Sequence, residues 1–149
     1  MGEIKLLPPI QLVTGIGLLV KGRVHFPKDS IGQVVHCDDE DFIPFRKVTL
    51  DPTADQPEQP GAIFEVRFHF AKFSARTNIR LSLIPIPFII VQPGFRSKTW
   101  MLGEKSGAFR GLYEWDSLED ANNYWNSFPM KLMRNRAAED SLTYVVNAL

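Results

Sequence analysis

Histidine, cysteine and clustered acids are the side chains that most often bind metals or transfer protons. In this 149-residue chain they gather at one place, where His36 and Cys37 precede four consecutive acids at positions 38–41. Such a group could hold a cation through nitrogen and oxygen ligands. However, consecutive residues in a strand or turn point in different directions, and the Asp-x-Asp-x-Asp-Gly spacing of a calcium loop is missing. We therefore predict a solvated acidic turn and no metal site.

The motifs of the large enzyme classes are missing from the sequence. It contains no nucleophile elbow, P-loop, dinucleotide fingerprint or His-Glu-x-x-His. The three histidines, His25, His36 and His69, lie far apart, and Cys37 is the only cysteine, so neither a disulfide nor a thiolate cluster can form within the chain. Any site must therefore be built from side chains that the fold brings together.

The stretch 93–115, PGFRSKTWMLGEKSGAFRGLYEW, contains two alternating runs joined by a glycine-bearing turn. Strict alternation places Phe95 on the opposite side from Lys98 and Trp100 in the first run, and places Tyr113 and Trp115 together in the second. This pattern predicts a β-hairpin with large rings on both faces.

Two further elements are expected before this hairpin. Residues Ala62 to Phe70 alternate without interruption and predict a strand, and Ser74 is placed to cap a helix that begins near Ala75. Prolines at 85 and 87 should end or kink that helix. The apolar, proline-broken segment 83–91 is expected to pack under the core or into a subunit interface, or alternatively to form the greasy rim of a pocket for a lipophilic ligand.

After the hairpin, Ser117 to Asp120 resembles a helix capping box, Pro129 is suited to the start of another short helix, and residues 141–146 predict a last strand. From Ala62 the order is strand, helix, strand, strand, helix, strand. This is the βαββαβ pattern of an α+β, ferredoxin-like fold with an antiparallel sheet and both helices on one face. The bare face is expected to pack against the same face of a second copy, as a homodimer.

Residues 1–60 are predicted to form an N-terminal extension, and residues 61–149 the ferredoxin-like domain. The apolar run Ile10 to Val20 contains two glycines and precedes Lys21 and Arg23. It predicts a strand or short helix over the core or over a partner subunit, and its alternative is an anchor at a membrane surface. Residues 33–50 predict a hairpin, and the proline-rich stretch 51–61 predicts an exposed connector at the domain boundary.

The composition restricts the partners that we expect. Lys plus Arg equals Asp plus Glu, 17 each, so there is no overall positive field to draw the chain to nucleic acid. No apolar stretch reaches the roughly 18 to 20 residues that span a bilayer, and the first residues lack the positive region of a signal peptide. We expect a soluble, cytoplasmic protein without a nucleic-acid partner.

Several pieces of the sequence together resemble the YdhR-type mono-oxygenases of the dimeric α/β-barrel superfamily: FEVRFHFA (64–71), PGFRSKTW (93–100), EKSGA (104–108), GLYEWDS (111–117) and LEDANNY (118–124). The resemblance covers about residues 61–147. It implies a homodimer and a cofactor-independent oxygenation of a small lipophilic or aromatic compound. Pro85 and Pro87 depart from the long first helix usual in the superfamily, which also includes haem-degrading enzymes and binding proteins.

An oxygenase of this kind needs an apolar cavity, rings that hold the substrate flat, and groups that stabilise its anion. The resemblance implies His69 as proton acceptor and Tyr113 as hydrogen-bond donor. The substrate-binding candidates are aromatic walls and balancing cations: Trp100, Trp115, Arg67, Lys98 and Arg110.

Each candidate also has a plain structural alternative. The tryptophans and Tyr113 could be core aromatics, Arg67 and Arg110 could pair with glutamates across the sheet, and His69 could be an ordinary strand histidine. The alternative function is a non-catalytic module that binds a ligand, a lipid or a protein, or haem through His69 or His36.

Overall fold

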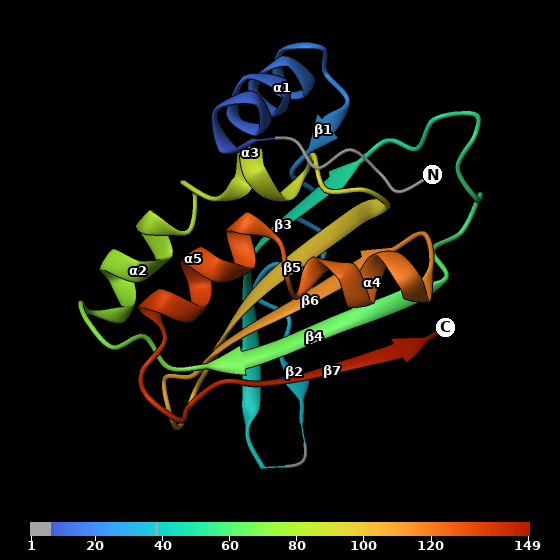
Figure 1. The fold of residues 1–149 in the computed structure, drawn as a ribbon. Helices are drawn as coiled ribbons and strands as arrows, with labels where there is room; N and C mark the ends of the chain where they lie inside the picture. Colours follow the sequence, from blue (N-terminus) through green and yellow to red (C-terminus); the bar gives the residue numbers. More distant parts are fainter. Residues whose placement is uncertain (1–6, 38) are drawn as a thin grey trace.

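A computed structural model of the chain describes residues 7–37 and 39–149. In this part of the chain the strands form one sheet in the order β1-β3-β5-β6-β4-β7, with β2 paired to β3 outside this path (Figure 1). All strand pairs are antiparallel. The strands are β1 (Val24–His25), β2 (Val35–His36), β3 (Asp41–Leu50), β4 (Ala62–Phe68), β5 (Phe95–Gly103), β6 (Phe109–Trp115) and β7 (Thr143–Ala148).

The predicted ferredoxin-like fold is confirmed. From β4 onward the chain runs strand, helix, strand, strand, helix, strand, and the sheet order β5-β6-β4-β7 places the first and third of these strands at the centre. The segment 1–60 adds β3 along the outer edge of β5, so that it extends the same sheet. A second copy covering the bare face remains a prediction.

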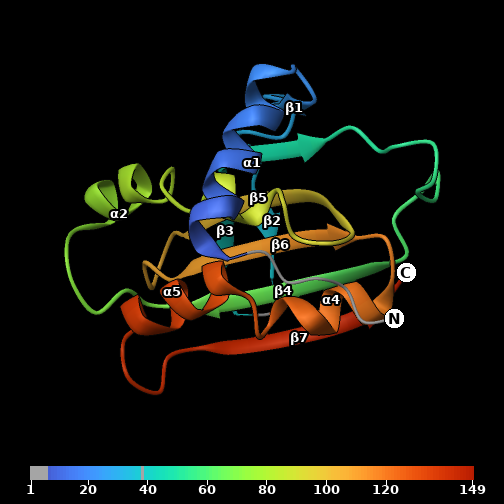
Figure 2. The same ribbon diagram turned by 45° about the horizontal axis from the view of Figure 1, so that its top comes forward.

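Helices cover one face of the sheet, as the two views in Figures 1 and 2 show. Side-chain hydroxyls cap three of them: Ser74 accepts from Thr77 N–H (3.2 Å), Ser117 from Asp120 N–H (3.1 Å) and Ser127 from Met130 N–H (3.3 Å). The predicted caps at Ser74 and Ser117 are therefore confirmed. The helices are α1 (Pro8–Val20), α2 (Ala75–Leu81), α3 (Ile86–Ile89), α4 (Leu118–Tyr124) and α5 (Phe128–Arg136).

A β-bulge in β5 corrects the predicted placement of the hairpin rings. The register shifts between Phe95 and Ser97, so Phe95 pairs with Trp115 and Lys98 pairs with Tyr113. Because cross-strand partners share a face, Phe95, Lys98 and Trp100 all point toward the helices. The prediction of large hairpin rings on both faces was wrong, since a single inserted residue reverses the alternation, and the rings join one core.

The face of the sheet opposite the helices carries paired polar groups beside a second, smaller cluster of buried residues around Phe42 and Met101. Arg110 Nε donates to Glu65 Oε1 (2.6 Å), and Ser97 Oγ donates to Glu114 Oε1 (2.7 Å). Arg110 thus makes the cross-sheet pair that was the structural alternative for this residue. Ile63 and Leu112 lie between these polar groups, half-buried.

The acidic turn is not simply solvated, which corrects the prediction. Glu40 is 7 % exposed and accepts hydrogen bonds from Ser106 Oγ (2.6 Å) and Arg67 Nη2 (2.8 Å). These bonds, that of Ser106 first, lower the pKa of Glu40. Asp38 lies outside the described residues. The turn therefore ties residues 39–41 to the rest of the sheet by an ion pair that the sequence did not indicate.

Helix α1 packs on α3 through a glycine. A Cβ atom added at Gly15 would lie 2.2 Å from the carbonyl oxygen of Pro87, whereas one added at Gly17 would meet nothing within 4 Å. Of the two predicted forms, strand or short helix, the structure shows a helix, and Val13 and Val20 on its outer side are exposed. Within the described residues, no helix has both the length and the apolar character to cross a bilayer.

We predict that Gly15→Ala lowers the free energy of unfolding by about 1 to 3 kcal/mol, because backbone must move to admit the methyl group. Gly17→Ala is the matched control, and it should leave stability unchanged or raise it by up to about 1 kcal/mol. Urea unfolding followed by tryptophan fluorescence measures both. Equal stability of the two variants would show that α1 does not pack as described.

Candidate functional site

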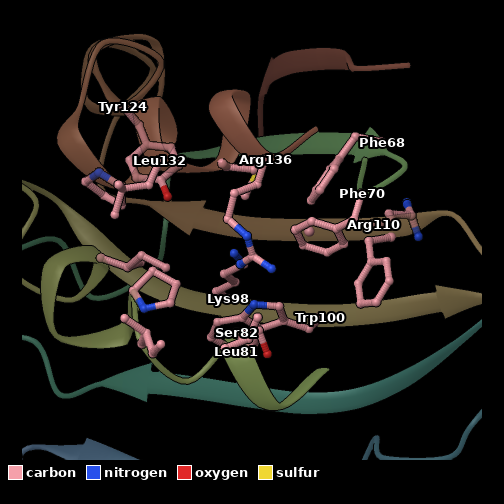
Figure 3. A pocket seen from close by; sticks show the side chains of 17 residues that line it. Phe68, Phe70, Leu81, Ser82, Lys98, Trp100, Arg110, Tyr124, Leu132 and Arg136 are labelled. Carbon is pink, nitrogen blue, oxygen red and sulfur yellow. The ribbon is translucent and has the colours of Figure 1, made fainter. Parts of the chain in front are cut away.

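An apolar cavity of about 240 Å³ lies between the sheet and the helices α2, α3 and α5 (Figure 3). Strands β4, β5 and β6 supply Phe68, Trp100 and Phe109, and the helical side supplies Leu81, Ile89 and Met133. Among the residues that the structure describes, no aspartate or glutamate lines it. The cavity therefore suits an apolar ligand that is neutral or negatively charged.

The proline-broken segment forms one wall of this cavity. Ile84 and Pro85 line it in the turn between α2 and α3, and Ile84 is also 61 % exposed to solvent. This agrees with the alternative prediction of a greasy pocket rim.

Lys98 is the main polar group of the cavity. Strand β5 holds it between Val48 on β3 and Tyr113 on β6, and the residue is 2 % exposed. Its Nζ lies 4.5 Å from the ring centroids of both Trp100 and Tyr113. Among the ion pairs of the described residues none includes Lys98. An amine is thus buried against aromatic faces without a carboxylate partner.

Burial lowers the pKa of Lys98 well below its usual value, and the positive charge of Arg46 lowers it further. Arg46 is fixed nearby, because its guanidinium donates to the Ser82 hydroxyl and to the Ile79 carbonyl oxygen (3.3 Å). It also lies 5.6 Å from the Trp100 ring centroid. Both effects favour the neutral amine, which is a base and a nucleophile.

Two tyrosines lie beside the amine. Tyr124 Oη donates to Tyr113 Oη over 3.1 Å, and both residues are buried. Burial raises the pKa of both phenols, so both stay protonated. Tyr124 lines the cavity, whereas Tyr113 is 0 % exposed and lies behind the cavity lining. Tyr113, the predicted donor, therefore does not line the cavity itself, but it contacts Lys98 and Tyr124, which do.

Arg136 brings a second cation to the cavity from the end of α5. Its guanidinium lies 4.5 Å from the Phe70 ring centroid and donates to the side-chain oxygen of buried Asn78. Figure 3 shows Arg136 reaching toward the same hollow as Lys98. Arg136 was not among the candidates that the sequence indicated. An isolated β-bridge joins Phe70 to Ala137, directly after the end of α5.

The structure places two other binding candidates at or near the cavity. Trp100 lines it directly. Arg110 also belongs to its lining, but its guanidinium pairs with Glu65 on the opposite face of the sheet and points away from the hollow in Figure 3. Trp115 is 0 % exposed in the core and does not line the cavity. Its role is one of packing in this arrangement.

Arg67 and His69 lie outside the cavity. Arg67 lies on the face of the sheet opposite the helices, where it forms ion pairs with Asp39 (2.9 Å) and Glu40 (2.8 Å). His69 follows the end of β4 and is exposed, and its main-chain N–H donates to Ser141 Oγ (3.1 Å). The side chain that sequence reasoning named as proton acceptor is therefore not where a ligand in this cavity would lie.

Comparisons with known proteins identify the fold. No family model matches the chain, and no curated protein matches its sequence. Among solved structures, a haem-degrading enzyme from Listeria monocytogenes superposes with a TM-score of 0.55 at 9 % identity, over 83 % of this chain and 95 % of that one.

Two further structures share this fold. An anthrone oxidase-like protein gives a TM-score of 0.51 at 12 % identity, over 73 % of this chain but 56 % of that one. An uncharacterized ferredoxin-fold protein related to antibiotic biosynthesis monooxygenases, also from Listeria monocytogenes, gives 0.50 at 9 % identity, over 84 % of this chain and 90 % of that one. At these identities the likeness is one of fold.

The cavity residues do not fit a haem site. Haem iron is usually held by histidine, thiolate, methionine with histidine, or tyrosinate, and neither histidine nor cysteine lines the cavity. Tyr124 is kept protonated by burial. The two predicted haem ligands lie elsewhere, since His69 is exposed and His36 bonds Asp41 (2.6 Å) with 81 % of its side chain exposed. Among residues 7–37 and 39–149, no three histidine, cysteine or acidic side chains gather to hold a metal ion.

The buried amine predicts a pH-dependent stability. In the unfolded chain lysine titrates near pH 10.4, and in the fold its pKa is lower. Between these two values the unfolded state binds more protons, so the stability of the wild type rises with pH. Lys98→Met should therefore be more stable than wild type at lower pH. The difference in the free energy of unfolding between the two proteins should narrow by up to about 1.4 kcal/mol per pH unit between the folded and the unfolded pKa of Lys98.

Urea unfolding of both proteins from about pH 6 to about pH 10 measures this gap. Lys131→Met, the same change at an exposed lysine on α5, is the matched control and should show no such trend. A gap between wild type and Lys98→Met that is constant over this range would contradict the assignment.

Proposed function

We propose that this protein binds a small apolar or aromatic compound in the cavity beside Lys98 and oxidises it with dioxygen, as a cofactor-independent mono-oxygenase-like protein. The observation that carries the proposal is the Lys98 amine, buried without a carboxylate partner and set against aromatic faces in an apolar cavity. The names of the structural neighbours and the resemblance to YdhR-type mono-oxygenases support the same class of chemistry.

Lys98 supplies the base in this proposal. A compound with an acidic C–H or O–H must become an anion before it can pass electrons to dioxygen. The neutral amine takes that proton, and the resulting ammonium lies between the faces of Trp100 and Tyr113. Arg136 adds positive charge at the cavity, which favours the ligand anion.

The overall reaction balances without an external reductant. A ligand methylene becomes a carbonyl, one oxygen atom of dioxygen enters the product, and the other leaves as water with the two hydrogens of the methylene. The four electrons that reduce dioxygen all come from the ligand. The cavity volume of about 240 Å³ lies below the usual range for drug-sized ligands, so a compound of one or two rings is the expected substrate.

Oxygen uptake with a panel of one- and two-ring ketones that carry an acidic methylene group, such as 2-indanone and 2-tetralone, tests the proposal. Lys98→Met should lose activity by about 100-fold or more, the contribution typical of a positioned base, while Lys131→Met on the exposed side of α5 keeps the wild-type rate. His69→Ala is a useful further variant, because loss of activity in it would support His69 as the proton acceptor, as the sequence suggested. Equal rates in wild type and Lys98→Met would exclude Lys98 as the base.

Ligand binding distinguishes oxidation from simple capture. Quenching of tryptophan fluorescence reports occupancy beside Trp100, which is 5 % exposed and lines the cavity. Saturable quenching without oxygen uptake across the panel would replace the oxygenase by a binding module of the same fold.

A further inference from the structure

A lysine amine whose neutral form is favoured by burial in an apolar cavity can do more than accept a proton. Its lone pair can attack a carbonyl carbon, which is how lysines form covalent imines with carbonyl substrates. Desolvation activates the amine for this attack, because it favours the unprotonated form. Lys98 meets the geometric conditions, since it lines the cavity, is 2 % exposed and forms none of the ion pairs among the described residues.

Lys98 also stands apart from the other lysines that the structure describes. Lys47 is half-buried, and the remaining ones, Lys21, Lys28, Lys72, Lys105 and Lys131, are exposed. None of these five or Lys47 lines the cavity. A carbonyl compound with an apolar body that binds in the cavity therefore lies beside Lys98, whereas the other lysines react with it only from solution.

We propose that Lys98 captures small apolar aldehydes, aromatic ones above all, as an imine inside this cavity. The nitrogen lone pair forms a bond to the carbonyl carbon, and the π pair of the carbonyl moves to its oxygen. One proton transfers from nitrogen to that oxygen, and the resulting hydroxyl takes the second proton of the nitrogen and leaves as water when the carbon–nitrogen double bond forms. One water is released, and nothing is oxidised or reduced.

The cavity walls determine which aldehyde fits. Trp100, Phe68 and Phe109 offer ring faces and edges from the sheet, and about 240 Å³ of space accommodates a single aromatic ring with its formyl group. In the described part of the chain, no carboxylate lines the cavity to compete for the amine or to hold it as an ammonium. Benzaldehyde and cinnamaldehyde match this description, whereas a sugar aldehyde would leave its hydroxyl groups without partners among the apolar walls.

This activity uses the same lysine as the proposed oxidation but does not rest on it. Imine formation needs no dioxygen and can be followed in its absence. Oxygen uptake without imine formation would refute only the present inference, and imine formation without oxygen uptake would refute only the oxygenase.

Borohydride trapping tests the inference on the full chain. The protein is incubated with benzaldehyde at neutral pH under nitrogen, sodium cyanoborohydride is added, and peptide mapping by mass spectrometry locates each benzyl group. Each pKa unit lost by an amine raises its neutral fraction about tenfold, so labelling at Lys98 should exceed labelling at Lys131 by about tenfold or more. One benzyl group per chain should dominate the intact mass.

Two variants and one wild-type measurement decide the outcome. Lys98→Met should lose the dominant label, and Lys131→Met should keep it. The wild-type peptide map alone is decisive where Lys98→Met folds poorly, because it reports the labelled position directly. Labelling spread over the exposed lysines with Lys98 unmodified, or equal labelling of wild type and Lys98→Met, would overturn the inference.

Discussion

The burial of the Lys98 amine is the constraint on which the rest of the site depends. Moving an ion of this size from water into a protein interior costs several kcal/mol, whereas a cation held over aromatic faces regains only about 2 kcal/mol. The rings of Trp100 and Tyr113, each 4.5 Å from Nζ, therefore do not offset the loss of hydration. The neutral amine is therefore the form of lower free energy, and it is also the form that can act as a base or a nucleophile.

The fold holds this amine in place from three directions. The β5 bulge turns Lys98 toward the helices, β6 places Tyr113 beside it, and β3 places Arg46 near it. Arg46 in turn donates to Ser82 and to the Ile79 carbonyl oxygen at the end of α2. The N-terminal segment thus contributes a charge that acts on the site, although it precedes the βαββαβ unit.

Sequence reasoning reached the elements of the fold but missed the contacts that make the site. The strand at Ala62, the cap at Ser74 and the order of elements follow from local patterns, which short-range physics largely determines. The β5 bulge does not, because a single extra residue leaves alternation looking regular on each side of it. Phe95 was therefore assigned to the wrong face.

Long-range contacts explain the other errors. Glu40 was predicted to lie in a solvated acidic turn, because Arg67 and Ser106, which donate hydrogen bonds to it, are distant in the sequence. Arg136 was not predicted as a site residue, because Asn78 and Phe70, which its guanidinium contacts, lie far from it in the sequence. Lys98 itself was chosen from the sequence as a balancing cation, and its burial reverses that role. No local pattern distinguishes a buried lysine from an exposed lysine at another position of the same strand.

The most direct test of this account is the titration of the Lys98 amine in the folded protein. Carbon-13 labelling of the lysine side chains gives one NMR signal per residue at the carbon next to the amine, and Lys98→Met assigns the signal of interest. The account predicts that this signal titrates well below the ordinary lysine pKa of about 10.4, apart from the signals of the exposed lysines. A Lys98 signal that titrates with the others would contradict it.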